Sequence, residues 1–228
     1  MPVQPLHVVR LAMVFGALTL VAGARPAAQQ TGTVRGRVSI GIPVTARRDT
    51  STYSRVVPTV ALAQESELRH VVVYLRDAPR TPVAPMHAEI RQQAENFVPR
   101  VVAVTVGSDV DFPNDDPIYH NVFSLSRVKT FDLGRYPRGQ SRRVRFDKPG
   151  VVKVFCQIHS HMSATVMIFD HPWFAVPGAQ GTFELPAIPP GAHGITAWHE
   201  RLGDTTAQVR VDPGKPVNTD FVLPVPEQ

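Results

Sequence analysis

The sequence predicts an all-β fold, and two observations support this prediction. Short runs in which apolar and polar residues alternate, many of them rich in valine, recur along the chain. Turn-forming residues are plentiful, with 15 glycines and 22 prolines among 228 residues. A chain of this length forms one or two domains and buries a substantial core.

The first 24 residues have the pattern of a secretory signal peptide. Arg10 precedes a short apolar run at 11–22, and Ala22-Gly23-Ala24 is a small-residue cleavage site. The apolar run is short for a membrane span, and an uncleaved anchor is the alternative interpretation. We therefore expect an exported protein, periplasmic or extracellular, without a stable membrane span after cleavage. Loss of Arg10 lowers the formal net charge from +5 to +4.

The chain then opens with a half-buried strand at 33–40, where valines alternate with arginines. Residues 41–69 show little periodicity, and we expect a long surface loop there. A second strand is predicted at 70–76, and a proline-containing connector at 80–87.

The middle of the chain is predicted to hold about eight strands. One precedes residue 100, and the others are expected at 100–106, 109–112, 121–125, 131–133, 141–146, 151–156 and 164–169. Turns and loops rich in Gly, Pro, Asn and Asp separate them, including a loop at 134–140. This number of strands is enough for a complete Greek-key sandwich.

The C-terminal part adds strands at 181–185, 194–199, 208–211 and 218–222. The 58 residues after residue 170 make only a thin core by themselves. We therefore expect residues 32–78 and 171–223 to form one smaller, discontinuous β-sandwich, with a domain at 84–170 inserted into it. A separate C-terminal module is the alternative.

The chemistry of the chain is concentrated around Cys156, its only cysteine, which His159 and Met162 follow at intervals of three residues. A lone cysteine in an exported protein has no intramolecular disulfide partner and is open to oxidation unless it is buried or bound to metal. Thiolate, imidazole and thioether suit a redox-active metal, above all copper, and His120 supplies a second imidazole beside a strand-like run. A buried, inert thiol is the alternative interpretation.

The predicted ligands of one type 1 copper ion are therefore His120, Cys156, His159 and Met162. His161, between two of these residues, is assigned to the exposed rim of the site rather than to the metal. Met167 is a second candidate thioether, but its place within an apolar strand indicates a core residue.

The motif His120-Asn121-Val122, followed by Cys156-x2-His159-x2-Met162, resembles the cupredoxins, and the short ligand loop is most like that of the amicyanins. The resemblance covers about residues 85–170. It implies a Greek-key cupredoxin sandwich, an electron-transfer role, and an Asn121 side chain that ties the ligand loops together by hydrogen bonds. It also implies an extended strand at 88–96, where composition alone favours a helix.

A second resemblance involves the two ends of the chain. Gly32-Thr33-Val34-x-Gly36-x-Val38 and the later run Gly181-x-Phe183-x-Leu185, with Pro189-Pro190-Gly191-x3-Ile195, are similar to carboxypeptidase regulatory-like (transthyretin-type) β-sandwiches. Nothing in the sequence places a site on this sandwich, so we expect a structural or partner-docking role for it.

These features predict a type 1 (blue) copper protein that carries one electron between redox partner proteins. The alternative is a copper-binding, delivery or sensing protein without electron transfer. We expect no enzyme: Phe155 and Gln157 flank Cys156, where a trinuclear copper site needs histidines, and no second cysteine is present for a binuclear site.

Other classes of site and partner receive little support. The remaining histidines show no close ligand spacing, so we expect no second metal site among them. Lys and Arg exceed Asp and Glu by 24 to 19, but they are spread along the chain rather than clustered with aromatic residues. We therefore expect no nucleic-acid binding.

Overall fold

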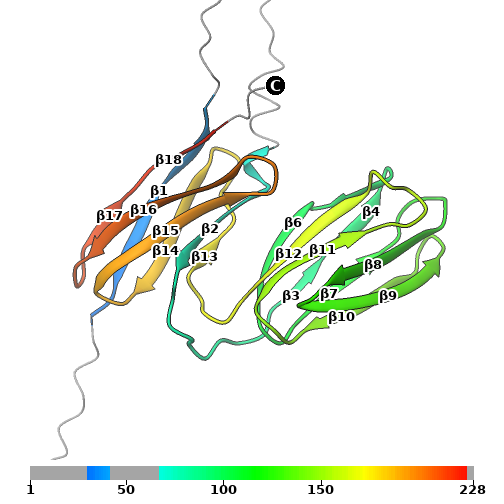
Figure 1. Cartoon of the computed structure of the whole chain (residues 1–228), viewed down its shortest axis with the longest axis horizontal. Coiled ribbons are helices and arrows are strands. Elements are labelled where there is room, and N and C mark those ends of the chain that lie inside the picture. Colours follow the sequence, from blue (N-terminus) through cyan, green and yellow to red (C-terminus); the bar gives the residue numbers. More distant parts are fainter. Residues whose placement is uncertain (1–29, 42–66, 225–228) are drawn as a thin grey trace, which may run out of the picture.

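The computed structural model describes residues 30–41 and 67–224, and within them nearly all regular structure is β-strand. The strands form two β-sandwiches that lie side by side (Figure 1). The predicted all-β fold with two sandwiches, one of them discontinuous, is confirmed. The predicted signal peptide and most of the predicted 41–69 loop lie outside the described residues.

The split sandwich is built from both ends of the described chain. Its strands are β1 (Gly32–Ile40), β2 (Val71–Arg76), β13 (Phe174–Ala175), β14 (Thr182–Ile188), β15 (Gly191–His199), β16 (Gly203–Val211), β17 (Pro216–Asn218) and β18 (Phe221–Leu223). One sheet has the order β14-β1-β17, with β18 also paired to β1, and the other has the order β13-β2-β15-β16. A single apolar core lies between the two sheets.

β1 shows why the predicted alternation produces this sandwich. Val34 and Val38 are buried in the core, while the arginines between them are exposed. Gly36 is required by close packing, because a Cβ at this position would lie 1.8 Å from the backbone oxygen of Thr219. The residues predicted as one strand at 218–222 form two strands instead, both parallel to β1.

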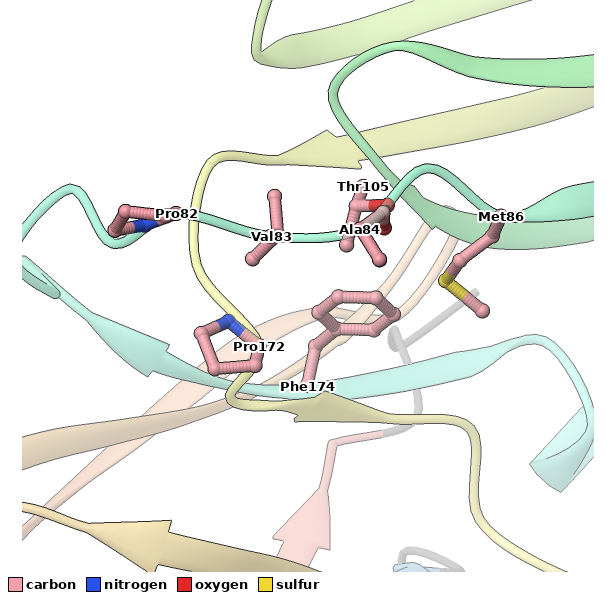
Figure 2. A pocket seen from close by; sticks show the side chains of 7 residues that line it. All are labelled: Pro82, Val83, Ala84, Met86, Thr105, Pro172 and Phe174. Atoms are coloured by element: carbon pink, nitrogen blue, oxygen red, sulfur yellow. The ribbon is translucent and has the colours of Figure 1, made fainter.

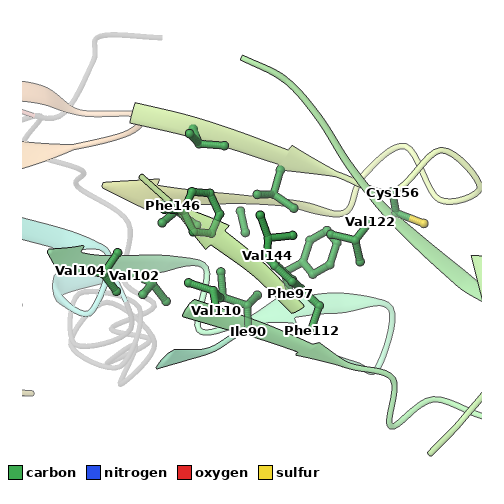
Figure 3. Close-up of a cluster of buried hydrophobic side chains, with 14 of the residues drawn as sticks. Ile90, Phe97, Val102, Val104, Val110, Phe112, Val122, Val144, Phe146 and Cys156 are labelled. Atoms are coloured by element: carbon green, nitrogen blue, oxygen red, sulfur yellow. The ribbon is translucent and has the colours of Figure 1, made fainter. Parts of the chain in front are cut away.

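The inserted sandwich contains all remaining strands of the described chain. They are β3 (His87–Glu89), β4 (Arg91–Gln93), β5 (Asn96–Val98), β6 (Val101–Thr105), β7 (Ser108–Pro113), β8 (His120–Ser126), β9 (Lys129–Tyr136), β10 (Ser141–Phe146), β11 (Gly150–Phe155) and β12 (Ser163–Phe169). A five-stranded sheet of order β6-β12-β11-β8-β9 faces a three-stranded sheet of order β10-β7-β3, and β4 and β5 form a separate hairpin. Valines and phenylalanines fill the space between them (Figure 3).

Two predicted elements differ in detail. Most of residues 88–96 are extended, as the resemblance implied, but they belong to three short strands rather than one, and a turn at Ala94 and Glu95 separates the last two. The predicted loop at 134–140 is wrong in its first half, because β9 continues to Tyr136. The side chain of Tyr136 is fully buried and its backbone pairs with His120, which keeps the chain in the sheet.

The two sandwiches meet over a small apolar cluster of Val72, Val101, Met167 and Phe169, with Tyr74, Ala103, Phe174 and Trp198 packed against it. Beside it, the Nζ of Lys153 lies 2.6 Å from the Oε1 of Glu200. A groove of about 380 Å³ lies at the same junction. Its lining includes Pro82 and Val83 of one connection, Pro172 of the other and Phe174 of β13 (Figure 2). The sandwiches are therefore packed against each other as well as joined by two connections.

Candidate metal centre

Three of the four predicted ligands lie on one short loop. Cys156 directly follows β11 and Met162 directly precedes β12, and the pairing of Phe155 with Ser163 closes the loop at its base. Within the loop, the N–H of Met162 donates to the carbonyl of His159 at 3.0 Å. The loop is therefore positioned by two paired strands and by its own backbone hydrogen bonds.

The fourth predicted ligand, His120, is the first residue of β8. This strand neighbours β11 in the five-stranded sheet, with Phe123 opposite Phe155. Because the pairing brings the start of β8 to the end of β11, His120 reaches the ligand loop although it lies 36 residues before Cys156.

The structure brings His120, Cys156 and His159 together. The two Nδ1 atoms are 3.0 Å apart, and the Sγ lies 3.9 Å from Nδ1 of His120 and 3.8 Å from Nδ1 of His159. In a triangle with these sides, the point equidistant from the corners is about 2.1 Å from each, close to the metal–nitrogen and metal–sulfur bond lengths of zinc sites, about 2.0–2.3 Å. The three side chains therefore fit a trigonal metal ion without rearrangement.

The surroundings of these atoms are largely apolar. His120 is 0% exposed, Cys156 3% and Met162 1%, and Cys156 and Met162 both belong to the core of the inserted sandwich. Figure 3 shows Cys156 at one end of that core, beyond Val122. His159 is only half-buried and thus forms the side of the group nearest to solvent. Met162, the fourth predicted ligand, follows Cys156 by six residues and is buried in the same core, but it is not among the three residues whose ligand atoms the structure brings together.

Asp116 determines which nitrogen of His120 faces the cysteine. Its Oδ2 lies 2.8 Å from the Nε2 of His120. An ionised carboxylate only accepts hydrogen bonds, so Nε2 carries the proton and the lone pair of Nδ1 points toward Cys156 and His159. Metal-binding histidines ordinarily have such a partner on the ring nitrogen remote from the metal. His120 is therefore held in the tautomer that binds a metal through Nδ1.

Asp116 is in turn held by the turn between β4 and β5. The backbone N–H groups of Ala94 and Glu95 donate to its two carboxylate oxygens, at 2.6 and 2.9 Å. Burial by itself raises the pKa of Asp116, but these hydrogen bonds and the one from His120 outweigh it and keep the pKa below its ordinary value. Sequence reasoning missed this residue, which stands in a loop where Asp is expected as a turn former.

A buried polar network extends from this region into the core. Gln92 donates to the hydroxyl of Tyr136, which donates to the carbonyl of Phe112. Asn114 donates to the carbonyl of Tyr136. Burial raises the pKa of the Tyr136 hydroxyl strongly, so it stays protonated and acts as a donor. The network joins the β4–β5 hairpin to β7 and to β9, whose Tyr136 pairs with His120 at the start of β8.

Asn121 lies behind Cys156. Its Oδ1 accepts the backbone N–H of Gln157 at 2.7 Å and is 3.6 Å from the Sγ of Cys156. It thus connects the β8 edge with the ligand loop, the position that the cupredoxin resemblance implied. The thiol of Cys156 is the donor in the second contact, because an amide oxygen only accepts hydrogen bonds.

His161 and Met167 lie outside the group of three ligand atoms. His161 is exposed, its Nε2 lies 3.0 Å from the carbonyl oxygen of Glu95, and its ring centroid is 6.2 Å from that of His159. Met167 is buried in the cluster between the two sandwiches. Its side chain therefore belongs to the core.

A second group of potential ligands, which the sequence did not predict, lies on the split sandwich. Atoms of Glu67, His70 and His199 are within 4.8 Å of one another. Nδ1 of His199 accepts the backbone N–H groups of Arg201 and Leu202, so Nε2 carries the proton and donates to Glu67 at 3.0 Å. Glu67 also pairs with Arg201. Burial lowers the pKa of His199, which keeps this ring neutral with Nε2 occupied by its proton. The hydrogen bonds thus describe a Glu–His pair rather than a set of free ligand atoms.

No family model matches the chain, and no curated protein matches its sequence. Among solved structures, a purple cupredoxin from Nitrosopumilus maritimus is similar with 23% identity over 36% of this chain and 99% of that chain, at a TM-score of 0.34. Amicyanin from Paracoccus versutus is similar with 16% identity over 42% of this chain and 97% of that chain, at a TM-score of 0.35.

A Cu-containing nitrite reductase from Thermus scotoductus SA-01 is similar with 22% identity over 48% of this chain and 26% of that chain, at a TM-score of 0.36. The structures to which this chain is similar thus include cupredoxins, at low identity and over less than half of its length. Within the described residues, no helix has the length and apolar character needed to cross a membrane.

Proposed function

We propose that this chain is an exported type 1 copper protein that carries one electron. One observation supports this above all: the Sγ of Cys156 and the Nδ1 atoms of His120 and His159 surround a point at bonding distance from all three. With Met162 as a weak axial ligand, this is the donor set of a blue-copper electron-transfer site. Bound copper supplies a one-electron couple between its two oxidation states.

The protein's own residues determine how easily such a site exchanges an electron. His120, Cys156 and His159 are held by paired strands and hydrogen bonds, so their positions change little when the charge at the centre changes. The carboxylate of Asp116 favours the more highly charged state of the centre, whereas the apolar core behind Cys156 opposes it. These opposing effects tune the reduction potential.

We also propose where the electron enters and leaves. His159 is the least buried of the three ligand side chains, and Ile118, Tyr119 and Ile158 next to the histidine ligands in sequence are exposed apolar side chains. An apolar surface of this kind suits brief contact with a redox partner protein, because it desolvates easily and needs no fixed ion pairs.

The split sandwich, residues 32–78 and 171–223, is proposed to be a carboxypeptidase regulatory-like domain with a structural or partner-docking role, and 84–170 a cupredoxin domain. Strand pairing supports the division, since every ladder of the described chain joins strands of the same sandwich. Export through the N-terminal segment is proposed from the sequence alone.

The absorption spectrum of the copper-loaded, purified protein tests the proposed function. An intense visible thiolate-to-copper band is expected, and Cys156→Ser should abolish it while the fold, followed by circular dichroism, is retained. A reversible one-electron reduction, measured by voltammetry, should bleach the band. A colourless protein that binds Cu(I) tightly would instead support a copper-delivery role and contradict the proposal.

A further inference from the structure

The hairpin turn between β4 and β5 contacts the candidate metal centre at two points. Its backbone N–H groups, from Ala94 and Glu95, donate to Asp116, which holds His120. Its carbonyl group, from Glu95, accepts the N–H of His161 in the ligand loop. The turn contributes only backbone atoms to these bonds, yet it connects the strand that carries His120 with the loop that carries Cys156.

The conformation of this turn is unusual for its residues. Gln93 pairs with Asn96, so Ala94 and Glu95 form a two-residue loop, and their φ angles are +50° and +53°. Such a loop strongly prefers Asn-Gly or Gly-Gly, because side chains are strained at positive φ. A strained backbone conformation of this kind persists only where contacts with the surrounding structure hold it in place. Here the carboxylate of Asp116, buried and bonded to both N–H groups, provides that constraint.

We propose that the Ala94–Glu95 turn is a positioning element of the metal centre: it fixes the Asp116 carboxylate, which in turn fixes the orientation and tautomer of His120. This inference rests on the proposed copper site. Asp116 has three donors around its two oxygens, two from the turn and one from His120. Without the turn, the carboxylate is free to rotate away from His120 or to exchange it for water.

The consequence concerns the preference between the two oxidation states of copper. A carboxylate bonded to the remote nitrogen raises the basicity of an imidazole ligand, and loss of such a partner typically costs 10–100-fold in metal affinity. The loss is greater for Cu(II) than for Cu(I), because the negative charge interacts more strongly with the more highly charged ion. For each factor of ten by which Cu(II) affinity falls more than Cu(I) affinity, the one-electron reduction potential rises by about 59 mV.

Three variants test this chain of contacts. Asp116→Asn removes the carboxylate charge. Insertion of one glycine between Ala94 and Glu95 lengthens the turn without removing a side chain, and the third variant combines both changes. Asp115→Asn is the matched control: the same substitution at the neighbouring residue, whose carboxylate pairs with Arg91 at the surface. The readouts are Cu(II) affinity by chelator competition, the reduction potential, and thermal unfolding of the metal-free protein.

We expect Asp116→Asn and the insertion each to lower Cu(II) affinity 10–100-fold and to raise the potential, with Asp115→Asn like the unaltered protein. Because the turn acts through Asp116, the combined variant should match the single variants rather than add their effects. An insertion that lowers only thermal stability, or losses of affinity that add, would overturn the proposal. If the lengthened hairpin does not fold, equal Cu(II) affinities of Asp116→Asn and Asp115→Asn overturn it. A missing thiolate band in the unaltered protein refutes the proposed function itself, and this inference with it.

Discussion

The surroundings of single imidazole nitrogens decide what the candidate centre can bind. His120 has its Nε2 bonded to Asp116 and its Nδ1 free toward Cys156, whereas His199 on the split sandwich has its Nδ1 occupied by two backbone N–H groups and its Nε2 protonated. Both rings are buried beside a carboxylate. Both rings donate from Nε2, and the difference lies at Nδ1: backbone N–H groups occupy it in His199, whereas in His120 it faces Cys156 and His159, where its lone pair is available to a metal.

The two histidines of the ligand loop should respond in opposite ways to substitution. His159→Ala removes an Nδ1 that lies 3.8 Å from the Sγ of Cys156, so the thiolate-to-copper band should be lost or strongly shifted. His161→Ala removes only a surface hydrogen bond to Glu95, so the band should remain. Visible absorption of both copper-loaded variants checks this, and the opposite pair of results would assign the ligand role to His161.

How far the sequence predicts the centre depends on how local each contact is. Cys156, His159 and Met162 stand at fixed spacing in one loop, and the motif at His120 supplies the second imidazole, so all four predicted ligands follow from the sequence alone; the structure brings His120, Cys156 and His159 together. Asp116 escapes such a prediction, because its role depends on a turn more than 20 residues earlier in the chain, and a Pro-Asn-Asp-Asp-Pro segment is typical of any surface loop.

At the scale of whole elements, β1 depends on close backbone packing as much as on its buried valines. Thr219, between β17 and β18, donates its N–H to the carbonyl of Arg35, and its own carbonyl lies over Gly36. The C-terminal strands can approach β1 this closely because Gly36 has no side chain. One glycine thus allows two short parallel strands to be added to the end of the sheet.

Gly36→Ala should therefore destabilise the protein. A methyl group 1.8 Å from a backbone oxygen must displace the segment around Thr219, and overpacking of this kind costs about 1–3 kcal/mol or more. Gly178→Ala is the control, because its Cβ would have only ordinary contacts with Thr182. Urea unfolding should show a lower midpoint for Gly36→Ala alone, and equal midpoints for the two variants would contradict the explanation.

Strand positions are predicted well where alternation is strong, and less well where pairing decides the end of a strand. β9 runs past Leu133 because Tyr136 has a buried place in the core and a backbone partner in His120, neither of which is visible in the local pattern. The β4–β5 turn could not be predicted either, since Ala-Glu has none of the residues typical of a two-residue hairpin.

For the molecule as a whole, the contact between the sandwiches combines apolar packing with ion pairs of Glu200, to Lys153 and, at 3.9 Å, to Arg100. The carboxylate of Glu200, between β15 and β16, accepts from Lys153 on β11, and the ammonium group of Lys153 also lies over the ring of Trp198. Burial by itself raises the pKa of Glu200, but the hydrogen bond and charge of Lys153, together with the charge of Arg100 and a hydrogen bond from Thr165, outweigh it and lower the pKa below its ordinary value of 4.5.

The sign of this shift gives a pH dependence. A carboxylate whose pKa is lower in the folded state stabilises the fold above its unfolded pKa, and the stabilisation is lost as the pH falls through the folded pKa. The unaltered protein should therefore exceed Glu200→Gln in unfolding free energy by about 1 kcal/mol or less at pH 7, and the difference should vanish as the pH falls well below 4.5.

Thermal or urea unfolding at several pH values measures this difference. Glu184→Gln, on an exposed position of β14, is the matched control. A difference between Glu200→Gln and the unaltered protein that is independent of pH would show that the ion pair with Lys153 is not its source.

The discontinuous arrangement of the split sandwich can be predicted from the sequence. The C-terminal 58 residues are too few for a core of their own, and the N-terminal strand has no partner strand nearby in the chain. The residues through which the two sandwiches contact each other cannot be predicted in this way. Met167 and Phe169 alternate in β12 as ordinary apolar residues, and nothing local distinguishes a side chain that faces the centre of its own sandwich from one that faces the other sandwich.

The junction between the two sandwiches also has a practical meaning. The chain leaves the split sandwich at the end of β2 and returns in β13, and these two strands are direct antiparallel neighbours, with Tyr74 opposite Phe174. The exit and return points are thus separated by about one strand spacing, ~4.8 Å. Any compact unit whose own ends lie that close together could be spliced in at this gap, so the split sandwich could accept another domain in place of residues 84–170.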